Sequence, residues 1–530
     1  MFTDERRDKV WNEIRQHDRR AFAGQLTPEV FAEAASQAGV RIGCSALNLV
    51  NLVWLGIGTA MQHACTFAFV LTMTLKTLED QEAFSSTPLG KQRKQQETKK
   101  KKKKNAKRCA KRKGKQKGKG GRKSKHHPHR NDPTQITEEA FAQARQRMPV
   151  AFWMALVTIL ARRFEQDHSR HMNFRGFRLL AMDGTTFKLP KTQALREHYG
   201  RPKNAARKKA APQARMVMLT LPGTRIPIAY EVSPLSTSEL KLAERLMPHV
   251  RANELLLMDR GFLSYGLFWQ IQNRQAFFGT RLKKNIKYKN VKQLGPKDWL
   301  VDWTPTDSRG QWKPLPRSIR LRVIRYQFPG FRASAIITNV LDPRRLSRED
   351  WVRLAHECDD NGKLTPGLYH RRWEIETSFF ELKVVLKTDS LRSRTPASLE
   401  YELAGRVVYY LLIRWLIVLA AEKHGIDPLR ISFSNAVREL DLMRAVLITS
   451  SPDWVAAVLL PRLLDRLATH LVPLRPGRHY PRANDTKPKD RGHGQKQKPS
   501  KLNSRINSNH KNTKRNSNRK NTKRKLRRQA

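Results

Sequence analysis

The sequence predicts a mixed α/β protein with a helical N-terminal region and disordered basic segments. Up to about residue 175 the apolar residues recur with helical spacing, and beyond it they form short strand-like runs. Two of these runs end at an aspartate, in the segments Asp183-Gly184 and Asp259-Arg260-Gly261. Two further tracts contain many Lys and Arg but too few apolar side chains to form a core.

The composition restricts the class of protein. The 530 residues carry a formal net charge of +58, which favours a polyanionic partner, nucleic acid first and an acidic membrane second. The 21 Phe, 11 Trp and 10 Tyr can build a substantial core, so the chain is not wholly disordered. Four widely spaced cysteines disfavour a disulfide scaffold and a zinc ribbon. Because the charged N-terminus does not resemble a signal peptide, we expect a cytoplasmic protein associated with the nucleoid.

The basic charge is concentrated in two tracts. Residues 91–130 contain 21 Lys and Arg against one acid, and residues 475–530 contain 20 against two acids. Neither tract can bury enough apolar surface to offset the entropy of ordering, so we expect both to be disordered. Each is a DNA-binding arm or a solubilising segment, and blocks of like charge favour the first interpretation.

Helical patterns come first along the chain. Residues 27–38 predict a helix with Thr27 as its N-cap and Pro28 in its first turn. Residues 45–75 are the most apolar stretch, but polar residues interrupt it, so two buried helices are favoured over a membrane span. Residues 136–147 and 149–164 predict another helical pair, which places the first basic tract in a surface loop of one helical domain.

Strand patterns follow over residues 177–182, 216–221, 225–231 and 254–258, with helical spacing over 238–250. We expect Asp183 at or just past the end of the first strand, and Asp259 directly after the last. Two carboxylates at strand ends can be held rigidly at one edge of a sheet, where they can bind a metal ion. Alternatively, each is an ordinary aspartate that caps a turn.

Residues 368–386 predict a strong helix in which four polar side chains share one stripe. At about 100° per residue the stripe lies within a sector of about 60°. It holds Tyr369, Arg372, Glu376 and Lys383. The other faces are expected to contact the core through Trp373, Ile375, Phe379, Leu382 and Leu386. A phosphate site explains the whole stripe, because Arg, Lys and the Tyr hydroxyl bind phosphate and the Glu adds to an acid cluster. A surface i,i+4 pair explains only Arg372 and Glu376.

These residues resemble a known family. Asp183 in LLAMDGTT, Asp259 in LLLMDRGF and the series Tyr369-x2-Arg372-x3-Glu376-x6-Lys383 are similar to the DDE transposases of bacterial insertion sequences, in the branch with a YREK signature. The segments RWEIE, FFGTRLK and IITNV add to the resemblance, which covers residues 175–425. It implies an RNase H-like catalytic core interrupted by a β-rich insertion. The lysine-rich insert and the long tail depart from the family pattern.

The resemblance also implies a metal-dependent site that uses Mg²⁺, with Mn²⁺ as a substitute. The catalytic and metal-binding residues would be Asp183, Asp259 and Glu376. Asp183 is expected to bridge two ions about 4 Å apart, and each of the other acids to hold one. The residues that contact DNA phosphates near the cut end would be Tyr369, Arg372 and Lys383. Independently of the family, three cations soon after the second acid are candidates for DNA backbone contacts: Arg281, Lys283 and Lys284.

The sequence therefore predicts a DNA transposase that nicks and joins strands at the inverted-repeat ends of an insertion sequence. Its expected partners are double-stranded DNA, as terminal repeats and as target, and a second copy in a paired-end homodimer, with no membrane. A transposase-derived DNA-binding protein without catalysis and a structure-selective nuclease remain alternatives. One of Trp299, Trp303 and Trp312 stacks on a flipped base, or all three serve packing.

The expected organisation has eight segments. They are an N-terminal helical region (1–88), a disordered lysine-rich insert (89–131), a continuation of the helical domain (132–174), the first part of the catalytic core (175–283), the β-rich insertion (284–364), the second part of the core with the YREK helix (365–425), a C-terminal helical region (426–474) and a disordered basic tail (475–530).

Overall fold

The computed structural model describes the parts of the chain that hold the helices and strands. These are residues 22, 24–42, 47–61, 137–202, 210–284, 286–305, 315–328, 332–353, 367–450 and 452–473. The two basic tracts, the second of the two helices expected in residues 45–75 and Trp312 lie outside the described residues.

The described N-terminal helices agree closely with the sequence patterns. They are α2 (Pro28–Gln37), α3 (Leu49–Met61), α6 (Glu138–Gln146) and α7 (Val150–His168). Thr27 is the N-cap of α2 and Pro28 occupies its first turn, as expected. Helix α7 continues beyond the predicted residue 164. Its last turn contains Phe164 and His168, which are buried against Trp415, and this tertiary contact is not visible in the local pattern.

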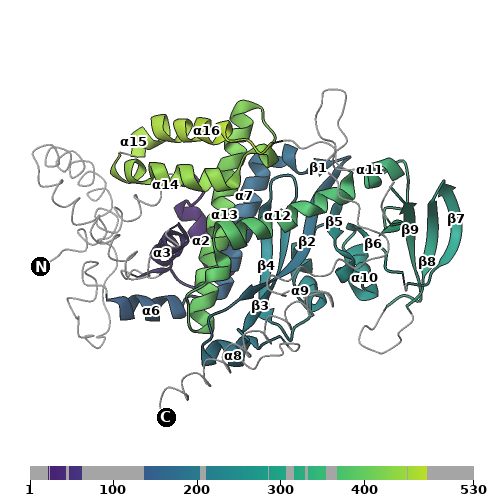
Figure 1. The fold of residues 1–530 in the computed structure, drawn as a ribbon, viewed down its shortest axis with the longest axis horizontal. Helices are drawn as coiled ribbons and strands as arrows, with labels where there is room; N and C mark the ends of the chain where they lie inside the picture. Colours follow the sequence, from purple (N-terminus) through teal and green to yellow (C-terminus); the bar gives the residue numbers. More distant parts are fainter. Residues whose placement is uncertain are drawn as a thin grey trace, which may run out of the picture. The chain divides into compact units, whose positions relative to one another are not determined.

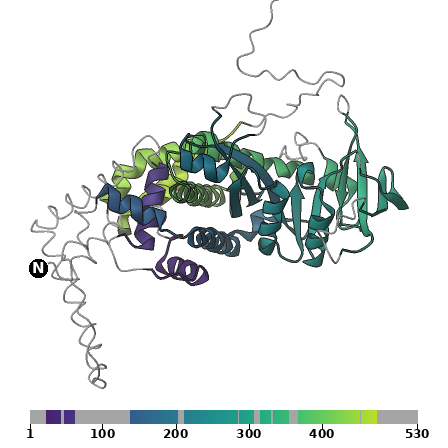
Figure 2. The same ribbon diagram turned by 90° about the horizontal axis from the view of Figure 1, so that it is seen from below.

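The C-terminal part packs against these early helices. It comprises α13 (Pro396–His424), α14 (Phe433–Thr449), the short α15 (Pro452–Trp454), a π-helical segment (Val455–Leu459) and α16 (Leu460–Thr469). Helix α13 contacts α3, α7 and α16, so segments more than 300 residues apart lie side by side (Figures 1 and 2). A Cβ atom at Gly405 would lie 2.8 Å from the carbonyl oxygen of Gly56, so the absence of a side chain lets α3 and α13 approach closely.

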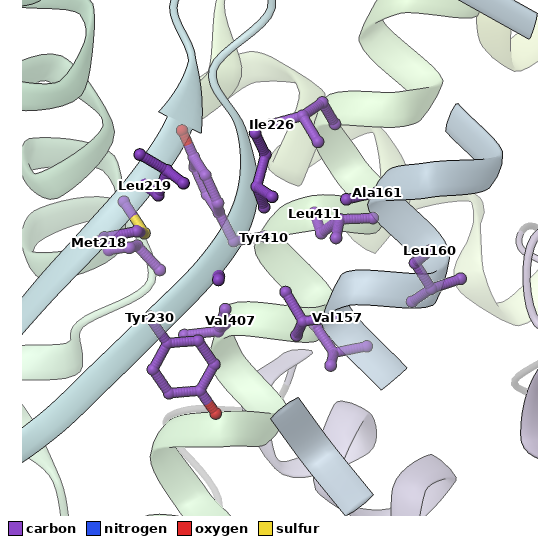
Figure 3. Close-up of a cluster of buried hydrophobic side chains, with 14 of the residues drawn as sticks. Val157, Leu160, Ala161, Met218, Leu219, Ile226, Tyr230, Val407, Tyr410 and Leu411 are labelled. Carbon is purple, nitrogen blue, oxygen red and sulfur yellow. The ribbon is translucent and has the colours of Figure 1, made fainter. Parts of the chain in front are cut away.

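Helix α13 is long and apolar enough to cross a membrane, but it is a core helix. In its most apolar window, 94% of the residues are buried inside the structure. Its partners include the sheet as well as other helices. In Figure 3, Val407, Tyr410 and Leu411 of α13 face strand residues such as Ile226 and Tyr230, with Val157 and Leu160 of α7 beside them.

One mixed sheet organises the rest of the described chain. Its strands are β1 (Asn173–Phe174), β2 (Phe177–Lys188), β3 (Gln213–Leu221), β4 (Ile226–Pro234), β5 (Glu254–Met258), β6 (Phe277–Arg281), β7 (Lys289–Gly295), β8 (Asp298–Trp303), β9 (Ile319–Tyr326) and β10 (Ser334–Thr338). The order is β4-β3-β2-β5-β6-β10-β9-β8-β7, and β1 pairs with β2. Strands β2, β5 and β6 are parallel, whereas the other pairs are antiparallel. The mixed α/β class is therefore confirmed, and residues 284–364 extend the same sheet through β7 to β10 (Figure 1).

Strand β2 does not end at Asp183, as the sequence pattern had suggested. It pairs in parallel with β5 only as far as Met182, but its antiparallel pairing with β3 continues to Lys188. Asp183 therefore occupies the first position of β2 that has left its parallel partner. The apolar run therefore predicts where the pairing of β2 with β5 stops, and among the described strands the polar extension pairs with β3.

The predicted helix over residues 368–386 is divided into three kinds of helix. It begins with a 3₁₀ segment (Leu368–Arg372), continues as α12 (Trp373–Phe380) and ends as a π-helical segment (Glu381–Val385). The ideal 100° spacing therefore does not hold along the whole stripe. Trp373 was expected in the core but is 54% exposed, whereas Ile375, Phe379, Leu382 and Leu386 are buried.

The remaining helices connect the strands. They are α8 (Gln193–Tyr199), α9 (Glu239–Leu246), α10 (Tyr265–Asn273) and α11 (Arg348–Val352). Helix α9 begins after the N-cap Ser238, whose side chain accepts a hydrogen bond from the backbone amide of Lys241. It packs on β3 and β4, while α12 packs on β2.

Candidate active site

Two of the three predicted acids lie in one row just beyond the last parallel pairs of β2, β5 and β6. Met182 of β2 pairs with Met258 of β5, and Met258 pairs with Thr280 of β6. The next residue in each chain segment is Asp183, Asp259 and Arg281, respectively. The register therefore places two carboxylates and a guanidinium side by side across three strands.

Arg372 connects the third acid to this row. Its Nη1 atom donates to Oδ2 of Asp183 at 3.0 Å, and its Nη2 atom donates to Oε1 of Glu376 at 2.6 Å. The expected i,i+4 pair does form, but it is not a surface pair, because only 6% of the Arg372 side chain is exposed. Glu376 of the helix thus faces Asp183 of the strand across one shared guanidinium.

Burial has the largest effect on the charge of Asp183. Burial raises the pKa of Asp183 from 3.8 to about 6. The backbone amide of Gly184, which donates to Oδ1 at 2.8 Å, and the charge of Arg372 act in the opposite direction. The carboxylates of Asp259 and Glu376 raise the pKa further, which shows that all three acids interact.

Tyr369 holds the helix against the sheet. Its side chain is buried, and its hydroxyl donates to the backbone carbonyl of Met258 at 3.3 Å, directly before Asp259. Burial raises the pKa of Tyr369 to about 12, so the hydroxyl keeps its proton. The structure therefore places this side chain next to the second acid, with its proton directed at the end of β5.

Lys383 lies further along β2 than the acids do. Its ammonium is 5.2 Å from the centre of the Phe187 ring, and burial lowers the pKa of its side chain. Phe187 is four residues beyond Asp183 on the same strand and, by alternation, on the same face. The ammonium of Lys383 therefore lies beside a later part of β2 than the part that holds Asp183.

The other sequence candidates differ in position. Arg281 belongs to the acid row, and its buried Nε atom has no hydrogen-bond partner among the described residues. Lys283 is half-buried and Lys284 is exposed, both beyond the end of β6. Trp303 is buried against the rings of Tyr265 and Phe268, which favours the packing interpretation for this side chain. The Trp299 ring lies under the guanidinium of Arg325.

The sequence patterns did not single out Glu239, a fourth acid near the row. A Cβ atom at Gly184 would lie 2.9 Å from Cδ of Glu239, and a Cβ atom at Gly261 would lie 4.0 Å from Oε2 of Glu239 and 3.9 Å from Oδ2 of Asp259. The glycines that follow the two aspartates therefore leave room for the first residue of α9. The two glycines were the only sign of this acid in the sequence patterns. They do not identify Glu239, because it is not adjacent to them in the sequence.

The donor set suits a hard divalent cation, since it consists of carboxylate oxygens. The guanidinium of Arg372 lies between Asp183 and Glu376 and supplies positive charge where those acids require it. Among the described residues, no three His, Cys, Asp or Glu side chains are already grouped to hold a metal ion. A metal ion held by these acids would lie next to the guanidinium of Arg372, which bonds to one oxygen of Asp183 and one of Glu376.

Comparison with known proteins finds similarity to transposases. Residues 175–412 match the family model described as a transposase DDE domain. The transposase InsG for insertion sequence element IS4 of Escherichia coli (strain K12) is 28% identical over 67% of this chain and 77% of its own length. The putative transposase InsZ of the same organism is 31% identical over 26% of this chain and 47% of its own.

A solved structure of a piggyBac transposase synaptic complex with hairpin DNA covers 68% of each chain at 13% identity. Its TM-score of 0.32 is too low to indicate a shared fold. The part of the chain that contains the acid row is thus similar to a transposase DDE domain. The chain is a DNA transposase homologous to that of IS4, and such enzymes cleave DNA and transfer strands.

The raised pKa of Asp183 predicts that D183N stabilises the protein at neutral and alkaline pH. Because this pKa is about 6 in the folded chain and 3.8 as a reference, ionisation of Asp183 costs stability above pH 6 and costs nothing below about pH 4. We expect D183N to raise the free energy of unfolding by on the order of 2 kcal/mol at pH 8. Urea denaturation across this pH range measures the effect. A variant that is destabilised equally at all pH values would contradict the electrostatic account.

Proposed function

We propose that this transposase belongs to the YREK branch and that Asp183, Asp259 and Glu376 are its catalytic acids. The observation that carries the proposal is the convergence of two strand aspartates and a helical glutamate, which all influence the charge of one carboxyl group. A turn-capping role for the aspartates does not account for Arg372, because its guanidinium joins the first acid to the third.

The sheet topology supports an RNase H-like core. Three antiparallel strands, β4-β3-β2, continue into two strands that run parallel to β2, namely β5 and β6. Strands β7 to β10 would then be the β-rich insertion between the second and third acids. The insertion would continue the sheet of the core at the β6 edge, since β10 pairs with β6.

Mg²⁺, with Mn²⁺ as a substitute, would be held by Asp183, Asp259 and Glu376. Bound there, divalent ions supply Lewis-acid stabilisation of the attacking and leaving oxygens during phosphodiester transfer. The protein's own part is to fix the acids on rigid strands and on α12. Tyr369 contributes by tying the start of this helix to β5 through the carbonyl of Met258.

The DNA would lie along the cations that border the acids. Tyr369, Arg372 and Lys383 would contact phosphates near the cut end, and Arg281 the adjoining backbone, with Lys283 and Lys284 next to it. The DNA would be the terminal inverted repeats of the element and then its target, with two copies of the chain holding paired ends. A net charge of +58 supports association with the nucleoid.

End-specific cleavage tests the proposed function. The substrate is a duplex of the DNA that flanks the coding sequence, incubated with the full chain and Mg²⁺. We expect D259N and E376Q to lose at least about 10³-fold in nicking rate, because each removes a charge that stabilises the transition state. DNA binding should be retained. Asp302, an acid of β8 paired with Arg320, provides the control variant D302N, which should cleave normally.

Three results would contradict the proposal. If D259N or E376Q nicks like the wild type, the acid is not catalytic. If the wild type binds the flanking DNA without cleaving it, the chain acts as a DNA-binding protein. Cleavage of any branched duplex without preference for the flanking sequence would indicate a structure-selective nuclease.

Arg281 provides a separate test of the DNA path. A buried guanidinium nitrogen without a partner gains a hydrogen bond if a phosphate binds it. We expect R281M to weaken DNA binding and to reduce the slope of log K against log salt by about 0.9, the value for one lost phosphate contact. Fluorescence anisotropy over a salt series measures this slope. R344M, which removes a 90% exposed cation, is the control, and equal slopes for R281M and the wild type would place Arg281 outside the DNA path.

A further inference from the structure

A buried arginine in the turn between β3 and β4 contacts α12 and the π-helical segment after it from the side opposite the acids; we call these two segments, which carry Glu376, the catalytic helix. The Nε atom of Arg225 donates to Oε2 of Glu374 at 2.7 Å, and its Nη1 atom donates to Oε1 of Glu381 at 2.9 Å. Only 11% of the Arg225 side chain is exposed. One guanidinium thus bonds to two carboxylates that lie two helical turns apart.

Glu381 is also held from helix α13. Tyr410 donates to its Oε2 atom at 2.9 Å, and the Nε atom of Arg414 donates to the same oxygen at 3.1 Å. Figure 3 shows Tyr410 beside Ile226, the residue that follows Arg225. We call Arg225, Glu374, Glu381 and Arg414 the Arg225 clamp. It joins the β3–β4 turn, the catalytic helix and α13 in the protein interior.

The backbone at Arg225 is itself unusual. Its φ is 61°, in the left-handed region that non-glycine residues seldom adopt. Such a conformation persists only where surrounding interactions determine it, and here the guanidinium is bound at both ends. The turn sequence Pro222-Gly223-Thr224-Arg225 therefore does more than reverse the chain. It directs a long cationic side chain toward α12.

The clamp and the acid site occupy opposite faces of one helix. Glu374 and Glu381 are seven residues apart, so they share a face, while Glu376 is two residues from Glu374 and therefore about 200° around the axis. Arg372 lies on the same side as Glu376, since its guanidinium contacts that residue and Asp183. Bonds that hold Glu374 and Glu381 in place therefore also fix the rotation of the helix, and with it the direction in which Glu376 points.

We propose that Arg225 is a positioning residue for the transposase reaction, which sets the rotation of the catalytic helix so that Glu376 and Arg372 face Asp183. The inference rests on the proposed role of Glu376. Among the described residues, the side-chain hydrogen-bond partners of Arg225 are Glu374 and Glu381, not the acids of the row, so it acts through these two carboxylates. Its effect should therefore appear in the rate of DNA cleavage measured with saturating protein, where a change in affinity through the DNA contacts of the same helix does not contribute.

The test uses the full chain and a duplex of the DNA that flanks the coding sequence. The variant R225G removes the guanidinium but suits a φ of 61°, so it does not strain the turn. R225K keeps the charge, but an ammonium does not bridge two carboxylates in the same way. R322M is the matched control, because Arg322 is a fully buried arginine whose carboxylate partner, Asp298, belongs to β8.

We expect R225G to cleave about 10²-fold more slowly than the wild type in single-turnover reactions with saturating protein, as for a catalytic group displaced by about 1 Å. The cleavage rate of R225K should lie between the rates of R225G and the wild type. R322M should unfold at a lower temperature and still cleave at the wild-type rate once folded. This pattern separates positioning from general destabilisation.

Other outcomes overturn the proposal. Wild-type cleavage by R225G would show that the clamp does not set the helix, while loss of cleavage by E376Q would leave the proposed function intact. An equal loss in R225G and R322M would indicate general destabilisation. If R225G does not fold, the test relies on R225K. A wild-type cleavage rate in R225K would then contradict the proposed positioning role of Arg225. If E376Q cleaves like the wild type, the proposed function and this inference fail together.

Discussion

The candidate site depends on how the structure accommodates like charges at the ends of two parallel strands. Pairing of β2 with β5 forces Asp183 and Asp259 into neighbouring positions, and α12 adds Glu376. Arg372 makes this arrangement compatible with burial, because its guanidinium bonds to the first and third acids together. Burial still raises the pKa of Asp183 to about 6, so the site retains an electrostatic cost that is typical of functional sites.

Local patterns predict the elements whose apolar residues lie between clear breaks. The run over residues 254–258 corresponds to β5, and the helix after Thr27 corresponds to α2. The patterns are less informative where tertiary contacts decide the structure. The end of β2 is determined by β3, and residues 368–386 change from 3₁₀ to α to π helix while binding to β5, to the acid row and to the Arg225 clamp.

The candidate site also contains some residues that local sequence patterns predict and others that only tertiary contacts reveal. Two strand-end aspartates and the spacing of Arg372 and Glu376 point to an acid cluster, because each element has its own signature in the sequence. Glu239 and Arg225 have no such signature. Glu239 is recognised only through the glycines that face it, and Arg225 only through carboxylates about 150 residues away, so their contribution becomes visible once the chain is folded.

Asp183 of β2 and Arg372, directly before α12, interact through a direct hydrogen bond. A double-mutant cycle with D183N and R372M, followed by urea unfolding, measures this interaction. The account predicts a coupling free energy of at least about 1 kcal/mol at pH 8. The coupling should shrink as the pH falls below about 6, where Asp183 gains its proton. Additive effects of the two substitutions at pH 8, within about 0.5 kcal/mol, would contradict the proposed arrangement of the acids.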